Sequence, residues 1–407
     1  MKKNLFFLMV SLFAVSAIAQ GYWTQKADLA GGARYFGSGM AIGDKGYIGL
    51  GSTITNPSNN DIWQYNPAVN TWTQIPDFYN ERIYSACFSI GNIGYVCSGC
   101  YWDGTSGTQP FVFYQDLRAY NPSTNTWTQK ADFPGTGRNG AFGFEIAGKG
   151  YVGMGLHREN DGSNTYYNDL YEYNPITNVW AQKASLPGSE RSYCINFSVD
   201  KYIFVGLGVN NVTQYLNDIW QYNSQTDTWT QMSNFPGSPR KYASSFVIGS
   251  KGYVFGGMDA TQYFNDLWEY DWNTDTWTQK ESLPSFARYS SIGFSINGKG
   301  YVGTGYAPDA GGRIDELWEY TPSTAAINEN HIENQILISP NPATDHIKIF
   351  IPQKVTLQII NINGQVLKTI YNNGKEITFD LGDLSSGVYI VKADTGDEIF
   401  RKIFIKE

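Results

Sequence analysis

The chain has 407 residues, with 29 basic and 37 acidic side chains and a formal net charge of −8 at pH 7. A nucleic-acid-binding protein would show a basic face or stripe, so we expect no nucleic-acid partner. Aromatic residues make up 16% of the chain and charged residues also 16%, which is typical of an all-β protein. Four cysteines are too few for a disulfide scaffold.

Residues 1–19 have the organisation of a secretory signal peptide. Lys2 and Lys3 precede an apolar run from residue 5 to residue 15, and Ala17-Ile18-Ala19 provides small residues for cleavage. The apolar run is shorter than the roughly 20 residues that a membrane span needs. We therefore predict a cleaved signal peptide and no transmembrane segment in the mature chain.

From residue 20 to residue 322 the sequence repeats one unit. Successive tryptophans are 48 to 55 residues apart, an arginine follows each after 10 or 11 residues, and a tyrosine lies seven residues before each of the last five. The tryptophans are Trp23, Trp72, Trp127, Trp180, Trp229 and Trp277, and the arginines are Arg34, Arg82, Arg138, Arg191, Arg240 and Arg288. A period of this size is the signature of a repeat architecture.

Each unit is predicted to contain four short antiparallel strands. In the fifth unit the first strand ends at residues 246–248, a glycine-containing turn leads to a second strand over 253–257, and a third covers 266–270. The fourth begins with Thr-Trp-Thr-Gln. First strands carry small residues such as Ser244 and Ser245, which suit the crowded axis of a ring. Four antiparallel strands repeated in this way predict the blades of a β-propeller.

These units resemble the kelch repeat, in which a double glycine ends one strand and a tyrosine and a tryptophan follow at fixed distances. Only Gly256-Gly257 is a true pair here. No tryptophan stands seven residues after Tyr320, whereas Trp23 opens the mature chain. We therefore predict a six-bladed kelch-like propeller over 20–322, closed by the N-terminal strand at Trp23, which would complete the last blade beside residues 315–320 and remove exposed sheet edges.

The remaining chain is predicted to form a linker over 323–335 and a small β-sandwich over 336–407. The second segment looks like the type A C-terminal sorting domain of the type IX secretion system of Bacteroidetes, through residues 339–343, 363–366 and 384–389. This resemblance implies export by the type IX machinery, which residues 336–407 would engage. The protein would then be released or attached to the cell surface. An ordinary adhesive sandwich is the alternative.

The kelch resemblance also indicates where a ligand would bind. In kelch proteins the arginine opens the innermost strand, and the loop between the second and third strands emerges on the same face. Guanidinium groups bind carboxylates and phosphates, and aromatic rings stack on sugars or anchor peptides. We therefore predict that the mouth of the channel binds a glycan or a partner protein. The candidate ligand-binding residues are Arg34, Arg82, Arg138, Arg191, Arg240, Arg288, Tyr84, Tyr193, Tyr242, Trp102, Tyr166 and Tyr263.

The alternative for the arginines is a structural role. They could pair with carboxylates such as Glu81, Glu190 and the aspartate before each third strand, and so hold the blades together. An arginine that occurs in all six units is explained equally well by a structural role that every unit requires.

The sequence provides little for catalysis, and we predict no catalytic residue, cofactor or metal site. His157 is the one histidine of the propeller, too few for a copper centre of the galactose-oxidase kind, and we expect it to be a solvated loop residue. Six-bladed kelch propellers include sialic acid mutarotases, so a carbohydrate-active enzyme of this mutarotase or epimerase kind is the alternative function. Glu159, Asp161, Glu190 or Asp259 could then act as acid or base, if burial raised its pKa.

Cys97 and Cys100 form an isolated Cys-x-x-Cys motif. A zinc site would need a second pair or histidines at ligand spacing, and a thioredoxin-like site would need a βαβ context. Cys87 is expected on the neighbouring strand, so a disulfide and buried unpaired cysteines both stay open.

Overall fold

A computed structural model describes residues 21–103, 111–159, 161–211, 214–323, 337–350, 354–361, 365–373, 377–394 and 399–407. The predicted signal peptide and nearly all of the predicted linker lie outside these ranges. Contacts divide the chain into a unit over residues 20–322 and a C-terminal unit from residue 323 onward. No helix in the described ranges is long and apolar enough to cross a membrane.

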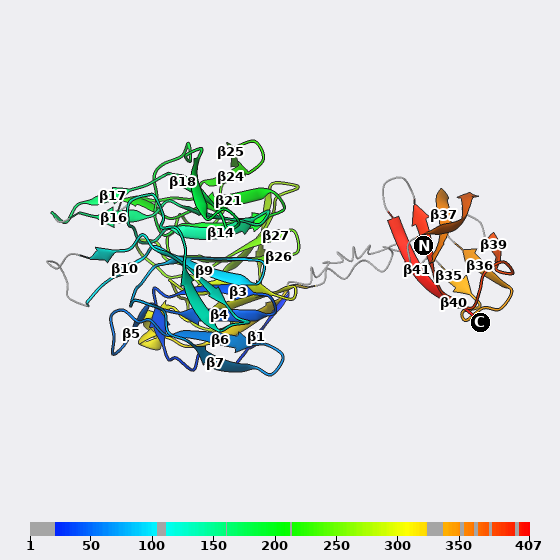
Figure 1. Ribbon diagram of the computed structural model, residues 1–407, viewed down its shortest axis with the longest axis horizontal. Helices are drawn as coiled ribbons and strands as arrows, with labels where there is room; N and C mark the ends of the chain where they lie inside the picture. Colours follow the sequence, from blue (N-terminus) through cyan, green and yellow to red (C-terminus); the bar gives the residue numbers. More distant parts are fainter. Residues whose placement is uncertain are drawn as a thin grey trace, which may run out of the picture. The chain divides into compact units, whose positions relative to one another are not determined.

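The described part of residues 20–322 contains six four-stranded antiparallel sheets (Figure 1). We call them blades 1 to 6 and give their strands from the inside outward. Blade 1 has β3 (Ser38–Ile42), β4 (Lys45–Gly49), β6 (Ile62–Asn66) and β7 (Thr71–Ile75); blade 2 has β8 (Ala86–Ile90), β9 (Ile93–Cys97), β12 (Leu117–Asn121) and β13 (Thr126–Gln129); blade 3 has β14 (Phe142–Ile146), β15 (Lys149–Gly153), β18 (Leu170–Asn174) and β19 (Val179–Lys183). Blade 4 has β20 (Ile195–Val199), β21 (Tyr202–Gly206), β24 (Ile219–Asn223) and β25 (Thr228–Met232); blade 5 has β26 (Ser244–Ile248), β27 (Lys251–Phe255), β28 (Leu267–Asp271) and β29 (Thr276–Lys280); blade 6 has β30 (Ile292–Ile296), β31 (Lys299–Gly303), β34 (Leu317–Thr321) and β1 (Tyr22–Gln25).

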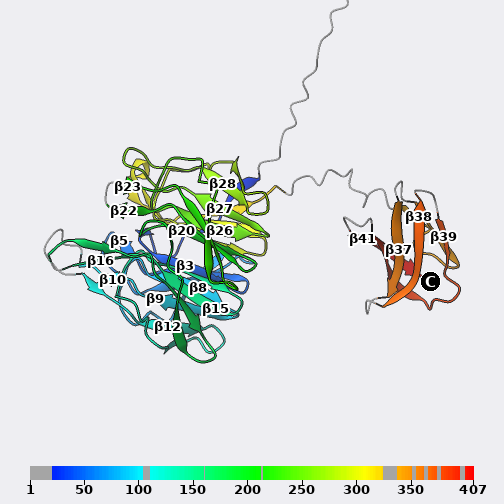
Figure 2. The same cartoon turned by 90° about the horizontal axis from the view of Figure 1, so that it is seen from above.

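The inner strands of the six blades form a closed ring. Contacts run from β3 to β8, β14, β20, β26, β30 and back to β3. Serine hydroxyls connect neighbouring inner strands: Ser38 Oγ donates to the Ser85 carbonyl oxygen at 2.9 Å, and Ser245 Oγ donates to the Asn196 carbonyl oxygen at 2.5 Å. Small residues are needed here because the inner strands converge on one axis. The ring of blades is the predicted β-propeller (Figure 2).

Burial within a blade follows the apolar pattern of each strand. The second strand, such as β15, is buried at four of its five residues, whereas the fourth strand, such as β13, is exposed at three of its four. The second strand carries a Lys-Gly-Tyr-Val-type run that packs on both faces, and the fourth carries threonine and glutamine. Gly252 shows how closely blades approach, because a Cβ atom there would lie 2.3 Å from the Phe197 ring of blade 4.

The repeated tyrosine and tryptophan tie each blade to the one before it. In blade 4 the Trp229 indole donates to the Ala184 carbonyl oxygen of blade 3 at 2.7 Å. Asp227, with φ 55°, accepts from the Tyr222 hydroxyl at 2.7 Å and from the Ala184 amide at 2.8 Å. Tyr222, Asp227 and Trp229 form this connection together, and this explains the fixed spacing between tyrosine and tryptophan in the repeat.

The ring closes as predicted, with the N-terminal strand in the last blade. Strand β1 pairs antiparallel with β34, and Trp23 lies opposite Tyr320. The Trp23 indole donates to the Glu281 carbonyl oxygen at 2.9 Å, and Lys26 forms an ion pair with Glu319 at 3.2 Å. The seam between the two ends of the propeller therefore uses the same tryptophan connection as the continuous blades.

A second layer of short ribbons covers one end of the channel, which we call the mouth. These ribbons arise mainly from the connections between second and third strands, which emerge at the same end of every blade; β5, β10, β16 and β17 share one side of Figure 1. The ribbons are β2 (Arg34–Tyr35) with β5 (Ser52–Thr53), β10 (Cys100–Tyr101) with β11 (Val112–Phe113), β16 (Leu156–Arg158) with β17 (Asn164–Tyr166), β22 (Val209–Asn211) with β23 (Gln214–Tyr215), and β32 (Tyr306–Ala307) with β33 (Gly312–Arg313) around the 3-10 turn η1 (Pro308–Ala310).

The C-terminal unit is the predicted β-sandwich. Its three-stranded sheet has the order β35 (Leu337–Ser339), β36 (His346–Phe350), β39 (Ile377–Asp380), and its four-stranded sheet has the order β38 (Val366–Asn373), β37 (Lys354–Asn361), β40 (Gly387–Asp394), β41 (Ile399–Lys406). Ile347 of the first sheet and Leu357, Val391 and Phe404 of the second are fully buried in one core.

Candidate functional site

The six repeated arginines are buried rather than open to a ligand, with exposed fractions of 0 or 1%. In blade 4, Arg191 Nη1 and Nη2 donate to the two carboxylate oxygens of Asp218 at 2.8 and 2.7 Å, and Nη1 also donates to the Leu207 carbonyl oxygen at 3.3 Å. Every blade repeats this ion pair with the carboxylate just before its third strand. The pairs are Arg34–Asp61, Arg82–Asp116, Arg138–Asp169, Arg191–Asp218, Arg240–Asp266 and Arg288–Glu316.

Aromatic rings also cover the guanidinium groups of three of these arginines, Arg82, Arg138 and Arg240. The Arg240 guanidinium carbon lies 3.6 Å from the centroid of Phe264 and 4.9 Å from that of Phe235. This geometry does not support the prediction that the arginines bind a ligand, because each fork already holds a carboxylate. It favours the structural alternative, with one correction: the partners are the residues before the third strands, not Glu81 or Glu190.

The residue two positions after each arginine lies on the channel axis in a left-handed backbone conformation. The φ values of these six residues lie between 53° and 61°, a region that non-glycine residues rarely adopt. They are Phe36, Tyr84, Gly140, Tyr193, Tyr242 and Ser290. The amide of Tyr84 donates to the Phe36 carbonyl oxygen at 2.9 Å, and that of Tyr242 donates to the Tyr193 carbonyl oxygen at 3.1 Å. Hydrogen bonds between successive members thus support this unusual backbone around the axis.

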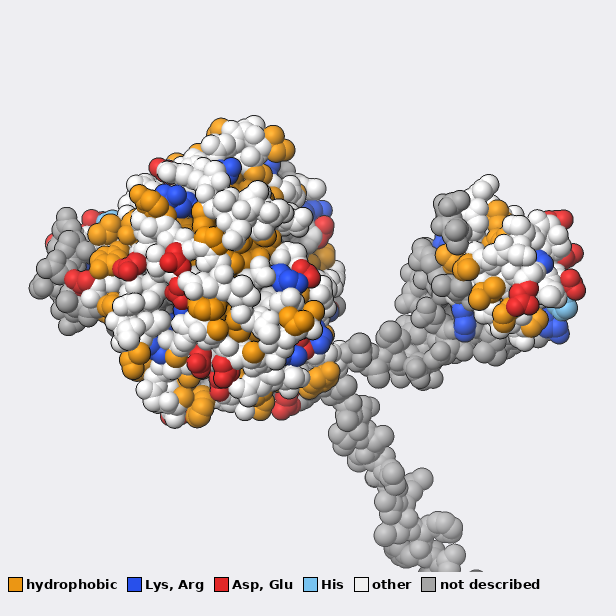
Figure 3. All heavy atoms as spheres, turned by 60° about the horizontal axis from the view of Figure 1, so that its bottom comes forward, with side chains coloured by type: hydrophobic (Ala, Val, Ile, Leu, Met, Phe, Trp, Pro, Cys, Tyr) orange, Lys and Arg blue, Asp and Glu red, His pale blue; other side chains and the backbone are white. Residues whose placement is uncertain are grey.

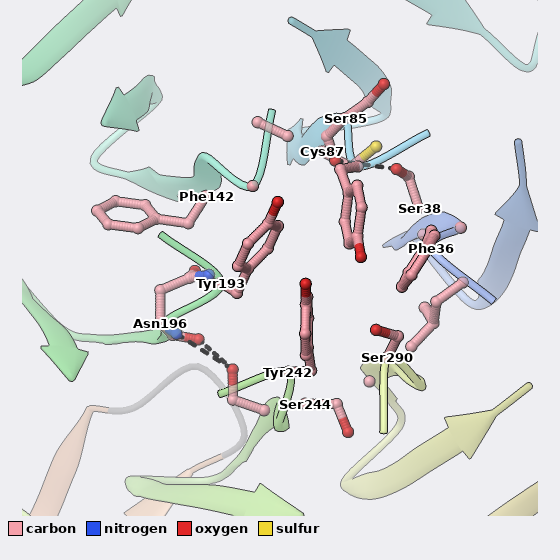
Figure 4. A pocket seen from close by; sticks show the side chains of 18 of the residues that line it. Phe36, Ser38, Ser85, Cys87, Phe142, Tyr193, Asn196, Tyr242, Ser244 and Ser290 are labelled. Carbon is pink, nitrogen blue, oxygen red and sulfur yellow. Dashed lines mark hydrogen bonds between the residues drawn. The ribbon is translucent and has the colours of Figure 1, made fainter. Parts of the chain in front are cut away.

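The four aromatic members of this set meet on the axis. Ring centroids of Phe36 and Tyr84 are 4.2 Å apart, those of Tyr84 and Tyr193 4.8 Å, and those of Tyr193 and Tyr242 4.4 Å. We call these four residues the aromatic plug, and Figure 4 labels three of them, Phe36, Tyr193 and Tyr242. Burial and neighbouring phenols raise the pKa of Tyr84 and of Tyr193 well above the ordinary value, so the plug is uncharged.

One cavity lies on each side of the plug. The inner cavity has about 240 Å³ and is lined by small residues of the inner strands, including Ser38, Cys87 and Ser244. The second cavity, which we call the mouth pocket, has about 160 Å³. Tyr193 and Tyr242 line both cavities, so the plug forms the floor of the mouth pocket.

The mouth pocket combines residues from blades 2 to 5, among them the β16–β17 hairpin of blade 3. Its lining is Phe111, Asn139, Leu156, Arg158, Asn164, Tyr166, Tyr193, Val209, Lys241 and Tyr242. Asn139 and Lys241 directly follow repeat arginines, and the Tyr193 hydroxyl donates to Asn139 Oδ1 at 3.2 Å. Backbone bridges hold these positions against the ribbons, as between Lys241 and Met258.

Two cations in this pocket, Arg158 and Lys241, form no ion pair with any described residue. Burial lowers the pKa of Lys241, whose Nζ lies 5.0 Å from the Tyr242 centroid and 5.5 Å from that of Tyr215. The Arg158 guanidinium carbon lies 5.7 Å from the Phe111 centroid. Within the described part of the chain, no carboxylate oxygen comes within the 4.0 Å that defines an ion pair with either cation. Lys241 is half-buried and Arg158 is exposed, and two such cations beside aromatic rings suit an anionic group of a ligand.

The structure separates the predicted aromatic site residues into groups. Tyr166, Tyr193 and Tyr242 line the mouth pocket and Tyr84 belongs to the plug. Tyr263 is 40% exposed and stacks on Tyr289 at the rim, with centroids 5.6 Å apart. Trp102 lines neither cavity, and its main chain is held by the Ser58 hydroxyl at 2.8 and 2.9 Å.

Arg158, Asn139 and Lys241 were not predicted as site residues from the sequence. A usable signal existed for Asn139 and Lys241, because the position after the repeat arginine varies among units whereas the arginine does not. Those positions hold Tyr35, Ile83, Asn139, Ser192, Lys241 and Tyr289.

His157 is held in place rather than solvated as predicted. Its Nδ1 lies 2.7 Å from the Gly137 carbonyl oxygen, and its ring lies 4.4 Å from Phe113. Among the candidate acid–base carboxylates, hydrogen bonds from Ser163 lower the pKa of Asp161. Burial would raise the pKa of Asp259, but hydrogen bonds from the loop it caps outweigh burial and lower it. Neither shift is the upward one that a general acid at neutral pH requires.

All four cysteines are unpaired. Burial raises the pKa of the Cys87, Cys97, Cys100 and Cys194 thiols to about 12 each. Of the two possibilities that the sequence left open, the structure shows unpaired thiols: Cys97 and Cys100 are buried, whereas Cys87 and Cys194 are half-buried and line the inner cavity. The described residues also contain no group of three or more His, Cys, Asp or Glu side chains that could hold a metal ion.

Comparisons with known proteins agree with this architecture. A family model described as the KLHDC2/KLHL20/DRC7 Kelch-repeats domain matches residues 160–357, and one described as a secretion system C-terminal sorting domain matches residues 337–406. The chain is a kelch-repeat propeller with a secretion sorting domain. The sorting domain indicates type IX secretion of this kelch protein to the cell surface or the extracellular space.

Similar proteins extend these matches. N-acetylneuraminate epimerase of Pasteurella multocida is 34% identical over 142 residues, which is 34% of each chain, and Kelch-like protein 25 of Xenopus tropicalis is 26% identical over 164 residues, 40% of this kelch protein and 27% of that one. The matches span only about a third of these relatives. The solved structure titled "Structure of YjhT" superposes with a TM-score of 0.62 at 16% identity, covering 72% of this chain and 96% of that one, which supports the propeller fold.

Proposed function

We propose that this kelch propeller is a secreted carbohydrate-binding protein whose mouth pocket holds the acidic group of a glycan. The observation that carries the proposal is the pair of unpaired cations, Arg158 and Lys241, that line one aromatic pocket. Elsewhere in the propeller the repeat arginines all have carboxylate partners. The face of the molecule drawn in Figure 3 shows acidic and basic side chains interspersed without a continuous basic surface.

The other groups of the pocket suit a sugar. The Asn139 and Asn164 amides and the Tyr166 hydroxyl can exchange hydrogen bonds with sugar hydroxyls, while the Tyr242 ring offers an apolar face. A cavity of about 160 Å³ has room for an acidic group and part of one sugar ring. N-acetylneuraminate epimerase, a relative by sequence, is named for an acidic sugar, and secretion would bring this protein into contact with extracellular glycans.

An epimerase or mutarotase is a second candidate, because that relative is named for such an activity. Among the described residues that line the mouth pocket there is no carboxylate. The one lining group whose pKa shifts toward neutrality is Lys241, so proton transfer in this site would depend on its amine. The test is NMR measurement of anomer exchange of N-acetylneuraminate with the wild-type protein and Lys241→Met. Exchange no faster than the uncatalysed rate would rule this candidate out.

The binding proposal is tested on a glycan array with the secreted protein and two variants, Lys241→Met and Arg158→Gln. We expect acidic glycans to bind and each variant to lose affinity by about tenfold or more, the effect of losing a charged hydrogen bond. Lys201→Met is the matched control, because Lys201 also lies over a tyrosine ring, 5.3 Å from Tyr202, but lines neither cavity. Binding of neutral glycans alone, or unchanged binding by both variants, would refute the proposal, and a blank array would shift the search to a protein partner.

A further inference from the structure

We infer that the mouth takes an acidic oligosaccharide chain of several sugar units rather than a single sugar. This inference rests on the proposed function and names its ligand more closely. It comes from a row of tyrosines that leads from the mouth pocket across the mouth to a third unpaired cation, Arg313.

The row begins in the mouth pocket and crosses three blades. The Tyr242 ring of the pocket floor lies 5.6 Å from Tyr289, Tyr289 lies 5.4 Å from Tyr306, and Tyr306 lies 5.4 Å from Tyr35, all between ring centroids. The three rings beyond the pocket are each partly exposed. Tyr263, at 40% exposure, widens the row where it stacks on Tyr289.

Arg313 stands at the far end of the row. Its guanidinium carbon lies 4.7 Å from the Tyr35 centroid, and its Nη2 donates to the Ser52 hydroxyl at 3.2 Å. Its Nε is buried and has no hydrogen-bond partner. No carboxylate in the described ranges forms an ion pair with Arg313, in contrast to the repeat arginines. Like Lys241, Arg313 therefore lacks a carboxylate partner among the described residues and is suited to bind an anionic group of a ligand.

The two cationic ends do not belong to one cavity. Lys241 lines the mouth pocket of about 160 Å³, whereas Arg313 and the rings of Tyr289, Tyr306 and Tyr35 lie outside its lining. A ligand that meets Lys241 at one end and Arg313 at the other must cover the tyrosines between them. A chain that carries acidic groups on separate sugar units meets both requirements.

The tyrosine row fits a sugar chain better than a nucleic acid. The Tyr289–Tyr306 and Tyr306–Tyr35 planes are inclined at 36° and 53°, so the row presents stepped rings and hydroxyl groups rather than one flat platform. Sugars offer hydroxyls and apolar ring faces in alternation, which suits tyrosine side chains. A nucleic acid would be repelled by a chain of net charge −8.

The test is isothermal titration calorimetry of the secreted protein with two series of uronic-acid oligomers, galacturonates and mannuronates, of one, two, four and six units. We expect affinity in at least one series to rise by about tenfold or more from one unit to four. Arg313→Gln should abolish this gain and leave the binding of the single sugar unchanged, whereas Lys241→Met should weaken every length. Arg313→Lys, which keeps the charge, should restore part of the gain.

The outcomes separate the two proposals. Equal affinity for one and six units in the wild-type protein would overturn the extended chain and leave the mouth pocket as a single-sugar site. A length gain that persists in Arg313→Gln would also overturn it. If neither series binds at any length, the extended-chain inference is overturned, and the glycan array alone decides the proposed function. Thermal unfolding of each variant ensures that lost binding is not lost folding.

Discussion

Arg191 and Asp218 face each other inside blade 4 with two nearly parallel hydrogen bonds of 2.8 and 2.7 Å, and the arginine side chain is fully buried. Burial alone would raise the pKa of Asp218, but the hydrogen bonds and charge of Arg191 outweigh it and hold this pKa below the ordinary value. The same pair recurs in all six blades. It connects the start of the inner strand to the start of the third strand, so it fixes the blade end that carries the mouth ribbons.

Replacing Arg191 by Met should therefore destabilise the fold. The variant leaves Asp218 partly buried without its partner, and breaking such a pair costs about 3 kcal/mol. Urea unfolding followed by tryptophan fluorescence measures the effect. Arg158→Met is the control, since Arg158 has no ion pair among the described residues and its loss should change stability by less than about 0.5 kcal/mol. Equal stability of the two variants would contradict the structural role of the repeat arginines.

The ring of left-handed residues around the plug gives a second prediction. Gly140, with φ 61°, is its glycine member, and a Cβ atom there would lie 2.3 Å from Ser192 Oγ. Gly140→Ala should cost more than the about 1–2 kcal/mol of a left-handed residue alone. Gly91→Ala isolates that backbone term, because Gly91 has φ 55° and no atom within 4 Å of the added Cβ. Thermal unfolding should order the proteins as wild type, Gly91→Ala, Gly140→Ala, and the reverse order of the variants would contradict the crowding of the axis.

The fold could be predicted because its determinants repeat. Trp229, Tyr222 and Asp227 form one connection between blades, and residues that act together must keep their spacing in every unit. Ring closure was predictable for the same reason, since the missing last tryptophan is supplied by Trp23.

The candidate site was harder to predict because its residues do not repeat. Lys241 and Arg158 come from different blades, and they line one pocket only in the folded propeller. The role of the repeat arginines was also open, because Arg191 and its partner Asp218 are separated by 27 positions. The spacing of residues in the sequence does not distinguish an arginine that is buried in an ion pair with such a carboxylate from an arginine that is free to bind a ligand.

The cysteines should be inert in the folded protein. A pKa of about 12 leaves almost no thiolate at pH 8, and all four cysteines are wholly or partly buried. With Ellman's reagent we expect no reaction of the native protein and four thiols per chain after unfolding in guanidinium. Fewer than four thiols in the unfolded, unreduced protein would reveal a disulfide and contradict the structure.

Glu319 makes the seam of the propeller sensitive to acid. It is 5% exposed and accepts hydrogen bonds from Tyr301 at 2.5 Å and Lys299 at 2.7 Å, and it pairs with Lys26, which follows the N-terminal strand. Burial would raise the pKa of Glu319, but the bonds from Lys299, Tyr301 and Lys26 together hold it below the ordinary glutamate value. A carboxyl group with a depressed pKa in the folded state stabilises that state above its unfolded pKa of about 4.3, and this stabilisation is lost as the pH falls through the folded pKa.

Glu319→Gln should therefore lower the free energy of unfolding by about 1–3 kcal/mol at pH 7 and by much less below pH 4, so that the difference between the variant and the wild type shrinks with acid. Urea unfolding at pH 7, 5, 4 and 3 measures this difference. Glu190→Gln is the control, because Glu190 is exposed and its loss should leave stability unchanged at each pH. A deficit of Glu319→Gln that stays constant from pH 7 to pH 3 would show that the charge of Glu319 does not hold the seam, and that the lost stability comes from packing alone.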